Sequence, residues 1–115
     1  MLKQQLNLFY IALGFLSRIP VPKTVDYSQS KLNQASRYFP LVGWLIGFLC
    51  ALAFWLNQLI LPLNIAILLS MLFSVFLTGC FHEDGLADTC DGFGGGWELA
   101  QKLSIMKDSR IGTYG

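Results

Sequence analysis

Four acidic side chains follow a long uncharged apolar run, in the order Glu83, Asp84, Asp88 and Asp91. On a helix of about 3.6 residues per turn, the three aspartates fall within an arc of about 60° on one face. A cation would offset the repulsion between them, and carboxylate oxygens suit Mg²⁺, which often bridges carboxylates to substrate phosphates. The spacing therefore predicts a magnesium or phosphate site at Asp84, Asp88 and Asp91. A solvated polar cap on a membrane helix is the alternative.

A second group of charged side chains lies near the C-terminal end of the sequence, at Lys107, Asp108 and Arg110, followed by a glycine-containing segment. Arginine offers bidentate donors to phosphate oxygens, and a bound metal can offset the remaining charge. We expect Lys107 and Arg110 to hold phosphate. Asp108 is a candidate metal ligand or general base, although other carboxylates nearby are equally available for proton transfer.

His82 and Glu83 resemble the start of an H-E-x-x-H zinc motif. Leu86 holds the position of the second histidine, and the chain contains a single histidine, so this zinc site is excluded. His82 is a candidate substrate contact, with a structural role as the slightly favoured interpretation. The cysteines form no C-x-x-C pair and are interpreted as packing residues.

The composition indicates a membrane protein. Hydrophobic residues make up 54% of the chain and charged residues 13%, with a mean hydropathy of +0.52. The net charge of +1 and the scattered basic residues give no support for nucleic-acid binding.

Residues 38–81 contain no charged side chain, a span too long for one membrane crossing of about 20 residues. Asn57, Gln58 and Pro62 mark a break, because proline suits the first turn of a new helix. We therefore expect a two-crossing hairpin with helices near residues 41–56 and 65–81. Small residues on both helices are predicted to form packing faces rather than a permeation path: Gly43 and Gly47 on the first, and Ser70, Ser74 and Thr78 on the second.

The apolar residues 6–16 lack the cleavage site of a signal peptide and are too short to span comfortably. We expect an interfacial or re-entrant helix that ends before Pro20 and Pro22, followed by a polar cytoplasmic connection over residues 23–37. Asp26 and Ser28 are its candidate helix N-caps. The fold class is thus an all-α, polytopic membrane helical bundle.

Beyond the acidic residues, the glycine-rich residues 92–96 predict a flexible turn. Leu99, Leu103 and Met106 then recur at helical spacing, and this face is expected to pack on the membrane bundle or at its interface. Basic residues flank the hairpin and are absent from its loop, so the positive-inside rule places both flanks and the acidic helix in the cytoplasm. These basic residues are Lys23, Lys31, Arg37, Lys102, Lys107 and Arg110.

Four blocks of the sequence resemble successive blocks of cobalamin synthase, the adenosylcobinamide-GDP ribazoletransferase family. They are FLSRIPVP at residues 15–22, FPLVG at 39–43 with Gly47, GCFHEDGLADTCDG at 79–92, and MKDSRIGTYG at 106–115. Two departures are mild: Glu83 stands where leucine is more frequent and Ser17 where threonine is frequent. Neither affects the aspartates.

The resemblance implies a Mg²⁺-dependent, multi-pass enzyme of the cytoplasmic (inner) membrane that performs a late step of cobalamin synthesis. Adenosylcobinamide-GDP and α-ribazole, or its 5′-phosphate, would give adenosylcobalamin, or its phosphate, and GMP. Family members are longer than this chain. Residues 1–115 are therefore expected to be the N-terminal part of one membrane-embedded transferase domain, inactive without its C-terminal half.

Two other functions remain open at this point. A CDP-alcohol-type membrane phosphotransferase also carries spaced aspartates, but Asp88 replaces the arginine expected after Ala87. A cation transporter fragment would place ionisable side chains at mid-membrane depth, and the predicted hairpin has none.

Overall fold

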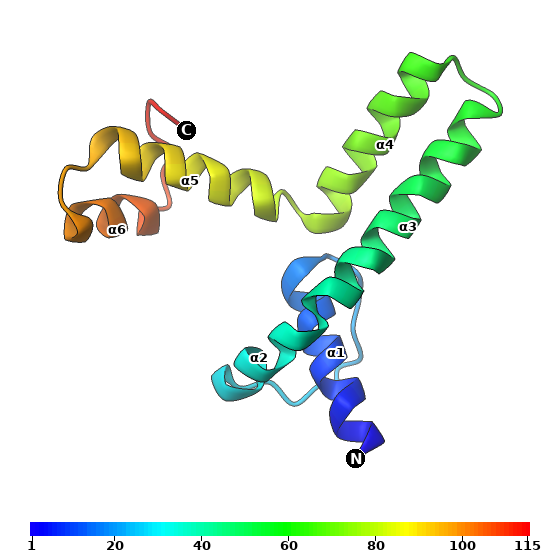
Figure 1. Ribbon diagram of the computed structural model, residues 1–115, viewed down its shortest axis with the longest axis horizontal. Coiled ribbons are helices and arrows are strands. Elements are labelled where there is room, and N and C mark those ends of the chain that lie inside the picture. The colour runs from blue at the N-terminus through cyan, green and yellow to red at the C-terminus, as the bar shows by residue number, and fades with distance from the viewer. The chain divides into compact units, whose positions relative to one another are not determined.

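The computed structural model describes residues 1–115, which form two helical units without any strand, Met1–Gly79 and Cys80–Gly115 (Figure 1). The first unit contains α1 (Leu2–Leu16), α2 (Gln29–Ala35), a 3-10 turn (Ser36–Tyr38), α3 (Phe39–Gln58) and α4 (Leu63–Thr78). The second unit contains α5 (Phe81–Gly95) and α6 (Leu99–Lys107). The all-α prediction is confirmed.

The buried core of the first unit lies where α1 packs against α2 and the start of α3. Its members are apolar side chains at helical spacing: Leu8, Ile11, Ala12, Leu13, Ala35 and Val42. The hydroxyl of Tyr38 donates a 2.6 Å hydrogen bond to Oε1 of Gln5, which ties the 3-10 turn to α1. The helix ends at Leu16, before Pro20, as expected, but it begins at Leu2 rather than near residue 6 because residues 2–5 are good helix formers.

The polar connection contains the short helix α2, and one of its two predicted caps is confirmed. Oγ of Ser28 accepts a 3.2 Å hydrogen bond from the backbone N–H of Lys31, as an N-cap should. Asp26 does not cap a helix. Its carboxylate pairs with the Lys31 ammonium group, and its backbone exchanges two 2.9 Å hydrogen bonds with the amide of Asn7.

The expected helical hairpin is formed by α3 and α4, and Pro62 is the N-cap residue of α4. Across the hairpin, Oγ of Ser70 donates a 3.0 Å hydrogen bond to the carbonyl of Cys50, so this part of the small polar stripe is a packing contact. The second helix ends at Thr78 rather than Phe81. Gly79 follows it with a φ of +66°, a left-handed backbone that glycine adopts without strain.

The helical stretch from residue 29 to residue 58 is long and apolar enough to cross a membrane. It has 30 residues and contains an 18-residue window with a mean hydropathy of 2.1, of which 6% is buried. Helix α4 has 16 residues. It reaches the length of a membrane span, 18 residues, only when it is counted together with α5 (Phe81–Gly95). One or two apolar helices of this kind indicate a membrane protein.

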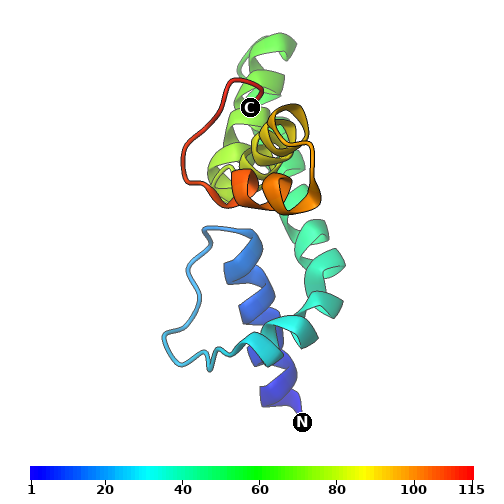
Figure 2. The same cartoon turned by 90° about the vertical axis from the view of Figure 1, so that its left-hand side faces the viewer.

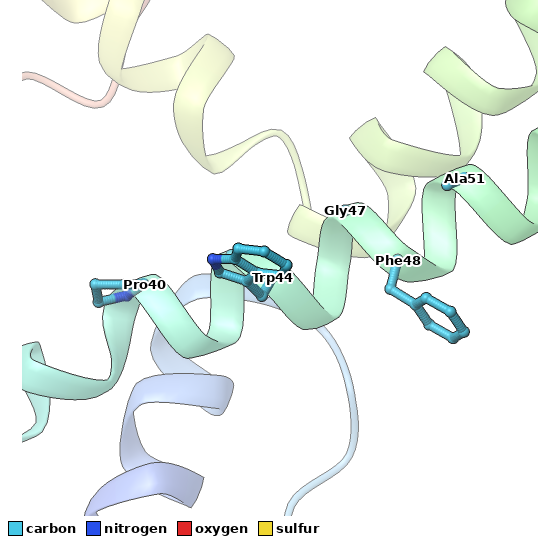
Figure 3. A pocket seen from close by; sticks show the side chains of 6 residues that line it. Pro40, Trp44, Gly47, Phe48 and Ala51 are labelled. Atoms are coloured by element: carbon cyan, nitrogen blue, oxygen red, sulfur yellow. The ribbon is translucent and has the colours of Figure 1, made fainter.

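Within the first unit, no helix packs on the face of α3 that contains Gly43 and Gly47. A groove of about 680 Å³ runs along this face, where the exposed rings of Trp44 and Phe48 stand beside the glycines (Figure 3). A Cβ atom added at either glycine would meet no atom within 4 Å. Helix packing on this face therefore stays a prediction.

The predicted turn at residues 92–96 is wrong, because α5 continues as a helix to Gly95 and α6 folds back beside it (Figure 1 and Figure 2). The glycines allow close approach instead. A Cβ atom at Gly92 would lie 2.7 Å from Cγ of Met106, and one at Gly96 would lie 2.7 Å from Cγ of Lys102. Met106 thus packs on α5, whereas Leu99 and Leu103 are exposed. Packing energy has overridden the low helix propensity of glycine.

Candidate functional site

Helix α5 carries all three predicted aspartates, so the helical spacing on which their common face depends is confirmed. Asp84 lies in the first turn, where a negative charge is favoured by the helix dipole. Asp84 is exposed, Asp88 is half-buried and Asp91 is 6% exposed. The three carboxylates therefore have different environments, and only the first two are open to solvent.

Asp84 and Asp88 form one wall of a cleft of about 380 Å³ within the second unit. The opposite wall comes from the end of α6 and the segment after it. It contains all three charged residues predicted there, together with neutral neighbours: Met106, Lys107, Asp108, Ser109, Arg110 and Ile111. The structure thus brings two carboxylates of α5 to the same cleft as the predicted phosphate-binding cations.

Asp108 and Arg110 form a bidentate ion pair on this wall. Nη2 of Arg110 lies 2.7 Å from Oδ2 of Asp108, and Nε lies 3.1 Å from Oδ1. The Arg110 side chain is the main reason that the pKa of Asp108 falls to about 2, and the same pairing raises the pKa of Arg110. Asp108 is therefore ionised at neutral pH and is a weak proton acceptor while this pair is intact.

Asp91 does not line the cleft, and its carboxylate binds the backbone of the C-terminal segment. Its Oδ2 accepts a 2.6 Å hydrogen bond from the N–H of Gly112, and Oδ1 accepts bonds of 3.0 and 2.8 Å from Tyr114 and Gly115. The hydrogen bonds from Gly112 and Gly115 are the largest causes that hold the pKa of Asp91 below its usual range. This long-range role could not be read from helical spacing.

His82 is exposed and does not line the cleft. Its ring meets the ring of Phe81 edge to face, with centroids 5.5 Å apart. No three histidine, cysteine, aspartate or glutamate side chains converge as a ready-made metal site. The candidate ligand set is therefore Asp84 and Asp88, with Asp108 facing them across the cleft.

Comparison with known protein families places this geometry in context. The family model described as cobalamin-5-phosphate synthase matches residues 8–115. The chain belongs to the cobalamin-5-phosphate synthase family. Membership supports the resemblance found in the sequence over both alternatives, the CDP-alcohol phosphotransferase and the cation transporter.

Members of the cobalamin-5-phosphate synthase family with high identity include two Shewanella proteins, each named adenosylcobinamide-GDP ribazoletransferase. The protein of Shewanella frigidimarina is 66% identical and that of Shewanella oneidensis 59% identical, each over 112 residues. The matched region is 97% of this chain and 43% of each relative, so the chain spans less than half the length of these relatives. No solved structure matches the chain.

Proposed function

We propose that the protein carrying this chain is an adenosylcobinamide-GDP ribazoletransferase. It would join adenosylcobinamide-GDP to α-ribazole or its 5′-phosphate, releasing GMP and forming adenosylcobalamin or its phosphate. The observation that carries this proposal is the family match over residues 8–115, which includes every residue lining the cleft. The names of the relatives supply the donor and the acceptor group.

In the proposed reaction, the ribazole hydroxyl oxygen attacks the phosphorus attached to the cobinamide. The bond from that phosphorus to the GMP oxygen breaks, GMP leaves, and the hydroxyl proton passes to a base. Negative charge develops on the oxygens around phosphorus during such a transfer. Lys107 and Arg110 line the cleft, and their positive charges would bind these oxygens. The Arg110 side chain is 85% exposed, so only its pair with Asp108 would have to open for it to turn toward a phosphate.

The chemistry of the donor set fits Mg²⁺. Asp84 and Asp88 lie one helical turn apart, face the cleft and take part in no ion pair. One or two carboxylates together with substrate phosphates are the usual environment of this ion. When bound there, Mg²⁺ would neutralise charge on the diphosphate. Asp91, the third predicted ligand, accepts hydrogen bonds from backbone N–H groups of the C-terminal segment.

Asp108 is the proposed general base, and its strength would depend on Arg110. While Arg110 is paired with it, the pKa of Asp108 is about 2. If the Arg110 side chain turns to a substrate phosphate, the largest cause of this low pKa is removed and the pKa of Asp108 rises toward the ordinary range for a carboxyl group. Substrate binding would thus make Asp108 a better proton acceptor when the hydroxyl group is present.

We further propose a location in the cytoplasmic membrane, with α3 and α4 crossing it and the acidic cleft on the cytoplasmic side. Basic residues flank the two helices, and their connecting loop has none. Nucleotides and Mg²⁺ would be available on that side.

The expected result of a labelling experiment follows from this topology. In a protein whose Cys50, Cys80 and Cys90 are replaced by alanine, a cysteine at Gln58 should react with an impermeant maleimide added outside the cytoplasmic membrane. A cysteine at Ser30, on α2, should react only after the membrane is opened. Both positions are exposed, so burial does not separate them. Protection of Gln58→Cys and labelling of Ser30→Cys from outside would contradict the orientation.

The function itself is tested with the protein made from the complete reading frame that encodes this chain, reconstituted in lipid. Adenosylcobinamide-GDP and α-ribazole should give GMP and adenosylcobalamin in equal amounts, and only with Mg²⁺ present. Absence of GMP release with either the free or the phosphorylated ribazole would contradict the proposal.

A further inference from the structure

Asp91 lies on the same helix as Asp84 and Asp88 but has a different set of partners. Its two carboxylate oxygens accept three backbone N–H bonds, from Gly112, Tyr114 and Gly115. All three donors belong to one segment more than 20 residues further along the chain. A carboxylate that accepts several backbone N–H groups is stabilised in its charged form.

The segment that binds Asp91 is shaped for close contact with α5. A Cβ atom added at Gly112 would lie 2.5 Å from Oδ1 of Asp91. One added at Gly115 would lie 2.6 Å from Oδ2 of Asp91 and 2.8 Å from the carbonyl of Ala87. A residue larger than glycine therefore does not fit at position 112 or 115 without a shift of its neighbours. The ring of Tyr114 also packs on α5, at Gly94.

The residues between these anchors form the far wall of the cleft. On one side, α6 is held to α5 where Met106 packs on Gly92. On the other side, Asp91 holds Gly112. The intervening residues 107–111 are therefore fixed at both ends, and these residues face Asp84 and Asp88. Loss of the second anchor would free Arg110, which lies two residues before Gly112.

We propose that Asp91 is a positioning residue, which acts by holding the segment of Gly112, Tyr114 and Gly115 so that Lys107 and Arg110 face the carboxylates of Asp84 and Asp88. This inference deepens the proposed function and rests on it for its link to phosphate binding. Three of the roughly four acceptor sites of the Asp91 carboxylate are occupied by these N–H groups, and the residue is 6% exposed, which leaves little room for a metal ion.

The test compares Asp91→Asn with Asp88→Asn in the protein from the complete reading frame. An asparagine at 91 keeps one acceptor oxygen but turns an NH₂ donor toward a backbone N–H group. Amide exchange of Gly112, Tyr114 and Gly115 should accelerate by at least about tenfold in Asp91→Asn and stay unchanged in Asp88→Asn. Mn²⁺, used as a spectroscopic substitute for Mg²⁺, should bind Asp91→Asn with the parental affinity and bind Asp88→Asn at least about tenfold more weakly.

Steady-state kinetics separate positioning from a general loss of folded protein. For Asp91→Asn, we expect kcat/KM for adenosylcobinamide-GDP to fall at least about tenfold and KM to rise, because Lys107 and Arg110 would bind the phosphate oxygens in the bound substrate as well as in the transition state. A fall in kcat that only matches the loss of folded protein, with KM unchanged, would overturn the positioning role. Weaker Mn²⁺ binding with unchanged amide exchange would overturn it in favour of a metal ligand. The exchange and metal measurements stay decisive even if the parental protein shows no ribazole transfer, an outcome that contradicts the proposed function alone.

Discussion

We expect the proposed ribazole transfer to fall by about 10²–10³-fold when Asp88 is replaced by asparagine. The substitution keeps the shape of the side chain and removes the negative charge that faces Lys107 and Arg110 across the cleft. Asp88 is half-buried and takes part in no ion pair, so its charge is available to a cation rather than to the fold. GMP release from adenosylcobinamide-GDP at saturating Mg²⁺ measures the effect.

A matched control for this substitution is Asp26→Asn in the first unit. Asp26 is an exposed aspartate whose carboxylate pairs with Lys31, a surface contact of the kind that contributes about 0–1 kcal/mol. We expect this variant to release GMP at close to the parental rate. Near-parental GMP release from Asp88→Asn as well would contradict a role in catalysis and would favour the alternative, in which the acidic residues of α5 are only a solvated polar cap.

Gly96→Ala should destabilise the second unit by about 1–3 kcal/mol, the range found when atoms are forced into a filled space. A Cβ atom at Gly96 would lie 2.7 Å from the carbonyl oxygen of Gly92 and 3.0 Å from the backbone nitrogen of Lys102. Both contacts are with backbone atoms, which cannot move aside as a flexible side chain can. The contact between α5 and α6 must therefore open, and the far wall of the cleft moves with α6.

The matched control is Gly85→Ala on the same helix. A Cβ atom at Gly85 meets nothing within 4 Å, and alanine is favoured over glycine inside a helix by about 1 kcal/mol. Thermal unfolding followed by helical circular dichroism should give a lower midpoint for Gly96→Ala and an unchanged or higher midpoint for Gly85→Ala. Equal midpoints for the two variants would show that α6 does not pack on α5 through Gly96.

The parts of this fold that the sequence predicted depend on local signals. The uncharged run and the break at Asn57 and Pro62 predicted the hairpin, because chain length and proline geometry act over a few residues. Ser28 was recognised as a cap for the same reason. The glycine-rich residues 92–96 misled, since glycine favours a turn locally but here admits Met106 and Lys102 from another helix.

The candidate site shows the same limit. Helical periodicity placed Asp84, Asp88 and Asp91 on one face, and the structure confirms the helix. The periodicity gave no indication that Asp91 would bind backbone groups of Gly112, Tyr114 and Gly115. That contact depends on how the chain after α5 folds back beside it. The glycines at 112 and 115 were the available signal, since glycine marks close backbone approach.

The cleft lined by Asp84 and Asp88 is proposed to hold a divalent cation beside Lys107 and Arg110. Mn²⁺ added to isotope-labelled protein broadens the NMR signals of residues close to the bound ion. The signals of Ala87, Asp88 and Ser109, which line the cleft, should broaden at the lowest Mn²⁺ concentrations, before that of Ser30 in the first unit. The doubly substituted protein Asp84→Asn/Asp88→Asn should lose this selectivity. Selective broadening of the cleft that persists in the double variant, or no selectivity in the parental protein, would contradict the account.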